Sequence, residues 1–124
     1  MATILIADDD AHIVRVMSIW LGRQGYETVS ARNGQEALEV LSAHDIDLVL
    51  SDMNMPLLDG LGLTKEIRER GLCDVPIILL TARCDQENLA TQLHEFGAQL
   101  APKPFIPSQL VEQINELLGS TSKA

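Results

Sequence analysis

The sequence predicts an α/β fold built on a parallel sheet of five strands with helices on both faces. Short apolar runs alternate with amphipathic stretches along the whole chain, which is the order expected when a helix follows each strand and crosses back over the sheet. Glycine, proline, asparagine and aspartate collect between these runs, where turns are needed. A length of 124 residues and an apolar content of 46% suit one domain with a packed interior.

The first two strand–helix units lie at the start of the chain. Thr3–Ala7 has the composition of a buried strand, and Gly25 is the expected left-handed cap of the helix that follows it. Tyr26–Ser30 alternates in character and predicts a short second strand. Asn33 and Glu36 have the spacing of a capping box at the start of the second helix. The apolar positions at helical spacing are Ile13, Met17, Trp20 and Leu21 in the first helix, and Ala37, Leu38 and Leu41 in the second.

Three further units complete the chain. Asp47–Leu50 is the expected third strand, and Ser51–Gly60 is too rich in Pro, Gly, Asn and Asp to continue it, so a loop is expected there. Pro76–Leu80 and Gln99–Ala101 are the expected fourth and fifth strands. Gly119 to Ala124 forms a small polar tail. The apolar positions of the last three helices are Leu63 and Ile67 before Gly71, then Leu89, Leu93 and Phe96 before Gly97, then Leu110, Val111, Ile114, Leu117 and Leu118.

The composition of the strands also predicts their places in the sheet. Strands 1, 3 and 4 are the most continuously apolar and are expected at the centre, where both faces are covered. Strand 2 is weaker, and strand 5 is short and runs into Pro102, which suits an edge. No repeat or interdomain linker is visible, so we expect one domain over residues 1–119, with residues 120–124 as a tail or the start of a linker.

Charge and composition exclude several classes of function. The net charge is −9, from 9 basic and 18 acidic residues, which disfavours direct binding to nucleic acid. Cys73 and Cys84 lack the spacing of a metal site and are expected to be free thiols in a reducing compartment. No apolar run approaches the roughly 20 residues of a membrane span, and the N-terminus lacks the features of a signal peptide. A cytoplasmic protein without a membrane partner is therefore expected.

Polar residues follow four of the five strands. Because ligands of an open parallel sheet bind beyond the carboxyl ends of its strands, these residues are expected to share one site. They are Asp8, Asp9 and Asp10 after strand 1, Asp52 and Asn54 after strand 3, Thr81 and Ala82 after strand 4, and Lys103 after strand 5.

This set has a consistent chemistry, although each residue alone has an ordinary structural explanation. Clustered carboxylates repel one another unless a cation neutralises them, and oxygen ligands favour Mg²⁺ or Mn²⁺. Asp52 can act as a nucleophile on phosphorus. A metal ion, the Lys103 amine and the Thr81 hydroxyl can hold the phosphoryl oxygens, and the small Ala82 leaves room for the group. Taken singly, an aspartate at this position is usually a helix cap, a threonine a strand former and a lysine a solvated charge.

The same residues give the chain a strong resemblance to a known family. Its motifs are Ile6-Ala7-Asp8-Asp9-Asp10, Ser51-Asp52-Met53-Asn54-Met55-Pro56 through Asp59-Gly60, Leu79-Leu80-Thr81-Ala82 and Lys103-Pro104-Phe105. In this order the motifs resemble those of the receiver domain of two-component response regulators, over Thr3 to about Leu118. The resemblance implies a flavodoxin-like, doubly wound sheet of order 2-1-3-4-5 flanked by five helices.

The resemblance also implies a role for each site residue. Asp52 would be the phosphoacceptor, taking its phosphoryl group from a histidine kinase or a histidine phosphotransfer protein. Asp8 and Asp9, with Asp52 and the backbone carbonyl of Asn54, would bind Mg²⁺. Thr81 and Lys103 would contact the phosphoryl group beside Ala82.

The family is a signalling family and not a class of enzymes. Its members change their binding to an effector protein or a fused output domain through the face formed by helix 4, strand 5 and helix 5. The family's switch couples the threonine, here Thr81, to an aromatic residue on strand 5. This chain has Leu100 at that position, which departs from the pattern.

Three other functions would make different demands on these residues. A haloacid-dehalogenase-like phosphatase needs a second aspartate as a general acid, and Asn54 occupies that position. A dinucleotide-binding domain needs a glycine-rich turn where this chain has three aspartates. A pseudo-receiver, which binds partners without being phosphorylated, is the remaining alternative because of Leu100.

Overall fold

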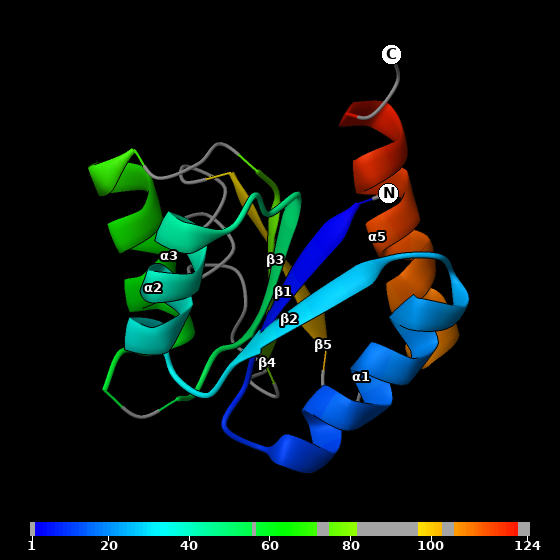
Figure 1. Ribbon diagram of the computed structural model, residues 1–124, viewed down its shortest axis with the longest axis horizontal. Helices are drawn as coiled ribbons and strands as arrows, with labels where there is room; N and C mark the ends of the chain where they lie inside the picture. Colours follow the sequence, from blue (N-terminus) through cyan, green and yellow to red (C-terminus); the bar gives the residue numbers. More distant parts are fainter. Residues whose placement is uncertain (1, 56, 72–74, 82–96, 103–105, 122–124) are drawn as a thin grey trace.

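The computed structural model describes residues 2–55, 57–71, 75–81, 97–102 and 106–121. Within them a five-stranded parallel sheet lies between helices on both of its faces (Figure 1). The strands are β1 (Thr3–Ala7), β2 (Glu27–Ala31), β3 (Leu48–Asp52), β4 (Ile77–Thr81) and β5 (Ala98–Pro102). The helices described are α1 (Ala11–Arg23), α2 (Gly34–Ala43), α3 (Gly60–Arg70) and α5 (Pro107–Thr121).

The order of the strands is β2-β1-β3-β4-β5, which confirms the predicted topology. Every pairing is parallel, and β1, β3 and β4 occupy the centre as their apolar composition predicts. β1 has the predicted ends, and the ends of the other four strands differ from the sequence-based expectation by one or two residues. The largest difference is at β3, which continues through Ser51 and Asp52, two residues expected in the loop. Both residues are buried and pair with β4. Pairing with the neighbouring strand therefore keeps them in β3, although serine and aspartate are typical of loops.

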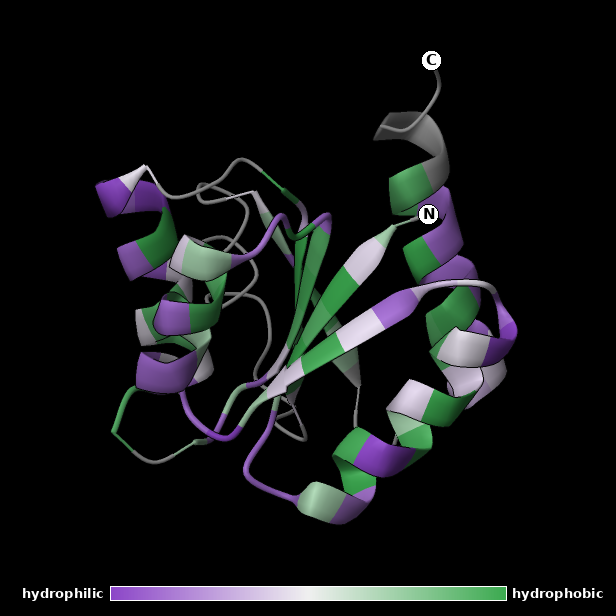
Figure 2. Ribbon diagram, in the orientation of Figure 1, coloured by the Kyte–Doolittle hydropathy of each residue, from purple (hydrophilic) through white to green (hydrophobic). Residues whose placement is uncertain are grey.

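Successive side chains along each strand point to opposite faces of the sheet, so the apolar interior forms two layers. Ile4 and Ile6 of β1 face α1 and α5, whereas Leu5 and Ala7 face α2 and α3. The same alternation continues in β3 and β4, whose five residues each are all buried. Figure 2 shows the apolar strands between helices whose outer faces are hydrophilic. Each helix therefore buries one apolar stripe against the sheet.

Side chains at the helix starts satisfy backbone N–H groups that have no partner inside the helix. Asp10 caps α1, Asn33 caps α2 and Asp59 caps α3. Glu36 completes a variant of the expected capping box, because its carboxylate accepts from the backbone N–H of Arg32 and not from that of the cap residue. Gly25 has a φ of +88°, so the predicted left-handed cap after α1 is confirmed.

The last helix is longer than its apolar pattern indicates. α5 continues to Thr121, whereas the apolar pattern ends at Leu118 and a polar tail was expected from Gly119. The predicted helix carrying Leu89, Leu93 and Phe96 lies outside the described residues, as do Cys73 and Cys84. Among the described residues, no helix is long and apolar enough to cross a membrane.

Candidate functional site

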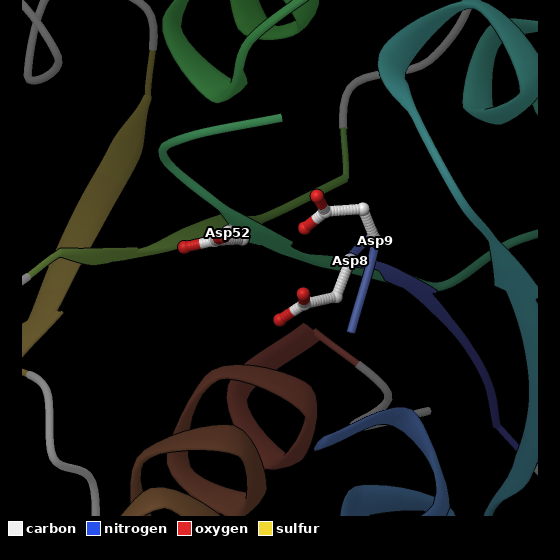
Figure 3. A group of neighbouring side chains, drawn as sticks. All are labelled: Asp8, Asp9 and Asp52. Carbon is white, nitrogen blue, oxygen red and sulfur yellow. The ribbon is translucent and has the colours of Figure 1, made fainter. Parts of the chain in front are cut away.

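Three aspartates meet at the carboxyl ends of β1 and β3. One carboxylate oxygen each of Asp8, Asp9 and Asp52 lies within 4.8 Å of the other two. Asp8 and Asp52 are 2% and 6% exposed, whereas Asp9 is exposed. In Figure 3 the carboxylates of Asp8 and Asp9 extend from the end of β1 toward the side where Asp52 lies. The sequence-based expectation that these residues share one edge of the sheet agrees with this arrangement.

The pairing of the central strands produces this proximity. Ala7 of β1 pairs with Ser51 of β3, so Asp8 and Asp52, each one residue further on, lie side by side. Hydrogen bonds to the flanking strands hold the ends of both segments in the sheet. The N–H of Asp8 donates to the carbonyl of Ala31 at 3.0 Å, and the N–H of Met53 donates to that of Leu80 at 2.9 Å. The two acids are therefore fixed by backbone contacts on both sides.

Asp10 holds the segment that carries the first two aspartates. Its side chain accepts from the N–H of His12 at 2.9 Å, which anchors it to the start of α1. Its own N–H donates to Oδ1 of Asp8 at 2.9 Å. Asp10 is thus the structural member of the aspartate run, and its hydrogen bond orients the Asp8 carboxylate.

The turn after β3 fixes the backbone of Asp52, and sequence reasoning missed this role. The N–H of Gly60 donates to the carbonyl of Met53 at 2.9 Å, which brings the start of α3 against the end of β3. A Cβ at Gly60 would lie 2.6 Å from the carbonyl oxygen of Asp52, closer than atoms can approach. The buried Ser51 hydroxyl donates to the same oxygen at 2.9 Å. The Asp59-Gly60 pair was visible in the sequence as a cap and a turn, but the contact with Asp52 depends on the fold.

A second contact attaches this turn to α2. The carbonyl of Leu58 accepts from the N–H of Gly34 at 3.2 Å. A Cβ at Gly34 would lie 2.4 Å from that oxygen, so the close approach requires glycine. Leu57 has a φ of +68°, which is unusual for a residue with a branched side chain, and it is exposed. The turn is therefore held at both ends while Leu57 projects outward.

The other predicted site residues lie on β4, on β5 and in the turn after β3, except for two that are outside the described residues. Thr81 ends β4 and is buried, and the exposed Asn54 follows β3 in the turn. Leu100 is partly buried on β5 and packs against the layer under α2 and α3. It pairs with Leu79 while Thr81 pairs with Pro102, so Leu100 and Thr81 are diagonal neighbours on one face of the sheet. Ala82 and Lys103 lie outside the described residues.

The donor set of the cluster fits a hard divalent cation. Three carboxylates so close together repel one another, and a cation between them removes that repulsion. Their oxygen atoms are the ligands that Mg²⁺ or Mn²⁺ prefers, and the cluster includes no histidine or cysteine that would favour zinc. Asp9 reaches solvent, whereas Asp8 and Asp52 are buried, so an ion could enter from the rim and remain partly hydrated. The site can therefore hold a cation beside the buried carboxylate of Asp52.

Comparison with protein families and sequences gives one consistent result. Residues 4–115 match the family model of the response regulator receiver domain. The chain is 39% identical over 121 residues to a probable transcriptional regulator, ycf27, of Porphyridium aerugineum, covering 98% of this chain and 50% of that protein. It is 34% identical to the response regulator SaeR of Staphylococcus aureus, covering 99% of this chain and 53% of SaeR. The chain thus spans about half the length of the curated relatives it matches.

Solved structures agree with this result. The receiver domain of a Francisella response regulator superposes with a TM-score of 0.89 at 30% identity, covering 98% of this chain and 99% of that one. The response regulator TrrA of Thermotoga maritima, solved in complex with Mg²⁺ and BeF, gives a TM-score of 0.82 at 35% identity, covering 95% of this chain and all of TrrA. Similarity therefore extends over nearly the whole chain in both sequence and structure.

Replacing Gly60 with alanine tests the contact beneath Asp52. The added methyl group would meet the Asp52 carbonyl and the Met53 backbone, which cannot move without disturbing β3. We expect Gly60→Ala to lower the free energy of unfolding by about 1–3 kcal/mol, measured by urea denaturation. Gly22→Ala is the matched control, because nothing lies within 4 Å of its added Cβ. This control should be unchanged or more stable by up to about 1 kcal/mol. Equal stability of the two variants would contradict the contact.

Proposed function

This chain belongs to the response regulator receiver domain family, and we propose that Asp52 is the residue at which it receives a phosphoryl group. The proposal is carried by the cluster in which Asp52 lies within 4.8 Å of Asp8 and Asp9. A buried acid at the end of a central strand, beside two further acids, is costly unless the site binds a cation. A divalent cation bound there would also attract an anionic phosphoryl group to Asp52.

The proposed donor is the phosphohistidine of a histidine kinase or a histidine phosphotransfer protein. One carboxylate oxygen of Asp52 attacks the phosphorus atom, the phosphorus–nitrogen bond breaks, and an aspartyl phosphate forms. The released imidazole takes a proton from solvent. Ser51, Gly60 and the β3–β4 pairing hold the backbone of Asp52, so the residue that carries the carboxylate is fixed before the donor arrives.

The neighbouring residues would stabilise the charge that moves with the phosphoryl group. Asp8, Asp9, Asp52 and the backbone carbonyl of Asn54 would hold Mg²⁺ or Mn²⁺. When bound, the ion neutralises negative charge on the acids and on the phosphoryl oxygens. Thr81 would donate its hydroxyl to one phosphoryl oxygen and Lys103 its amine to another. Ala82 would leave space for the group.

The site lacks the acid that a phosphatase would need. Asn54 stands two residues after Asp52, where a general acid would stand in a phosphatase using this nucleophile, and an amide does not exchange protons near neutral pH. The aspartyl phosphate would therefore persist as a signal, and its slow loss would depend on solvent. This agrees with the signalling role of receiver domains in general.

The proposed output is a change in partner binding at the face that includes β5 and α5. The partner would be a downstream effector protein or an output domain fused to this one, as the greater length of the related regulators suggests. Leu100 lies on β5, diagonal to Thr81, and its side chain packs on the α2–α3 side of the sheet. It has neither the aromatic ring nor the hydroxyl group through which a rotation could be transmitted.

Phosphorylation can be tested directly by intact mass. With Mg²⁺ and a small phosphodonor such as acetyl phosphate, the protein should gain one phosphoryl group. Asp52→Asn should gain none, because an amide is not a nucleophile toward phosphorus at neutral pH. Asp59→Asn is a matched control, since Asn still caps α3 and should leave the adduct unchanged. Absence of an adduct in the wild type, when trapping rules out rapid hydrolysis, would favour the pseudo-receiver.

Cation binding can be tested without phosphorylation. In the absence of divalent cations, Asp9→Asn should melt at a higher temperature than the wild type, because one of three repelling charges is removed. Added Mg²⁺ should raise the melting temperature of the wild type, since a ligand of the folded state stabilises it, and should raise that of Asp9→Asn less. Asp10→Asn retains the α1 cap and should keep the full response. Equal Mg²⁺ responses in the two variants would place the ion elsewhere.

The consequence of Leu100 can be tested by restoring an aromatic residue. We expect Leu100→Tyr to enlarge the phosphorylation-dependent changes in amide chemical shift on β5 and α5, because the ring can occupy two positions beside Thr81. Leu100→Met keeps a flexible apolar side chain of similar volume and should respond as the wild type does. If all three proteins show the same shifts, the signal reaches this face without residue 100.

A further inference from the structure

A buried hydroxyl lies in the apolar layer on the α2–α3 side of the sheet, close to the end of β3. Ser51 is 0% exposed and pairs with Ala7 of β1 and Leu79 of β4, whose side chains belong to that layer. Residues paired in this way point to the same face of a sheet, so the Ser51 side chain lies among apolar neighbours. A hydroxyl in such surroundings is unfavourable unless it makes a hydrogen bond. The serine therefore needs a specific partner.

The partner of this hydroxyl is the backbone of the next residue. Oγ of Ser51 donates to the carbonyl oxygen of Asp52 at 2.9 Å. A second acceptor, Sδ of Met55, lies 4.0 Å away, and a thioether sulfur accepts hydrogen bonds only weakly. Because successive side chains of a strand point to opposite faces, the Ser51 side chain faces away from the Asp52 carboxylate. The hydroxyl therefore acts on the backbone of Asp52 and not on its side chain.

This hydrogen bond completes the anchoring of one peptide unit. The carbonyl of Asp52 and the N–H of Met53 belong to the same rigid plane. The N–H donates to a carbonyl of β4 at 2.9 Å, while the carbonyl accepts from Ser51. The next peptide unit is also anchored, since the carbonyl of Met53 accepts from the N–H of Gly60 at 2.9 Å. Both peptide units that connect Asp52 with Asn54 are thus held, and one of the three contacts comes from a side chain.

These two peptide units separate the two cation ligands that this segment would contribute. In the proposed function, a divalent cation binds the Asp52 carboxylate and the backbone carbonyl of Asn54. Mg²⁺ requires nearly octahedral geometry with ligands at about 2.0–2.1 Å, so a small rotation of an intervening peptide would move one ligand out of place. Groups that orient the ligands of a metal without touching it typically change metal affinity by about 10–100-fold.

We propose that Ser51 is a positioning residue for the cation, and that its hydroxyl fixes the spacing between the Asp52 carboxylate and the Asn54 carbonyl. The inference rests on the proposed cation site beside Asp52. Ser51 would touch neither the ion nor the phosphoryl group, because its side chain lies on the opposite face of the sheet from that carboxylate. Its effect would pass through the peptide unit that follows Asp52.

Titration of the intact chain with Mg²⁺, followed by amide chemical shifts, tests this role without phosphorylation. We expect Ser51→Ala to raise the Mg²⁺ dissociation constant on the order of tenfold, because the Asp52 carbonyl loses its hydrogen bond and the peptide can rotate. Ser51→Thr keeps the hydroxyl and should bind Mg²⁺ nearly as the wild type does. Ser51→Cys has a weaker donor of similar size and should lie between Ser51→Ala and the wild type.

Two control variants each remove a hydroxyl that donates to a carbonyl elsewhere. The lost bond joins successive turns of α2 in Ser42→Ala and of α3 in Thr64→Val. Thr64 is as fully buried as Ser51. Neither bond involves the peptide that follows Asp52, so both controls should keep the Mg²⁺ affinity of the wild type. Urea denaturation without divalent cations establishes that each variant is folded.

Several outcomes would overturn the role of Ser51. Wild-type Mg²⁺ affinity in Ser51→Ala would do so. Equal weakening in all three Ser51 variants would indicate packing and not the hydrogen bond, and equal weakening in the controls would indicate a general effect of lost hydroxyl groups.

Asp9→Asn separates these results from the proposed function. If the wild type does not bind Mg²⁺, or if Asp9→Asn binds it as tightly, the cation site and the role of Ser51 both fail. If Asp9→Asn weakens binding and Ser51→Ala does not, only the role of Ser51 fails.

Discussion

The register between β1 and β3 is the constraint on which the site depends. Pairing of Ala7 with Ser51 sets Asp8 beside Asp52, and a slip of one residue would turn one of the two acids to the other face. Two carboxylates about 4 Å apart near a surface repel by roughly 4 kcal/mol. Burying one leucine or isoleucine contributes about 1.5–3 kcal/mol, and β1 and β3 bury several, including Ile4, Leu48 and Leu50. The apolar strands can therefore hold together a cluster that is unfavourable by itself.

The segments around the cluster convert this proximity into fixed geometry. Asp10 ties the first two aspartates to α1, while Gly60 brings α3 against the backbone of Asp52 and Gly34 anchors the turn to α2. Three helices thus begin close to the cluster, each with a side-chain cap that directs its first turn. A site assembled from backbone contacts of this kind loses little entropy when a ligand binds, which suits the proposed role of Asp52.

Charged residues are distributed unevenly over this protein. The distribution differs between the strand ends that carry the aspartates and the helices α1 and α5. At the strand ends, like charges are gathered, which makes a cation the natural ligand. On the neighbouring helices α1 and α5, opposite charges are separated, because α1 carries Arg15 and Arg23 and α5 carries Glu112 and Glu116. The net charge of −9 describes neither surface, because it sums over both.

The sequence by itself determined the order of the elements, the central strands and the edge at which Asp8, Asp9 and Asp52 meet, because periodicity is local and parallel strands end at a common edge. It did not determine that β3 runs through Ser51 and Asp52. Polar residues followed by Pro and Gly are typical of loops, and only the pairing with β4 makes these two part of the strand. Nor did it reveal that Gly60 touches the Asp52 carbonyl, or that basic α1 lies beside acidic α5. These features join residues distant in the chain, and only the tertiary structure brings such residues within contact distance.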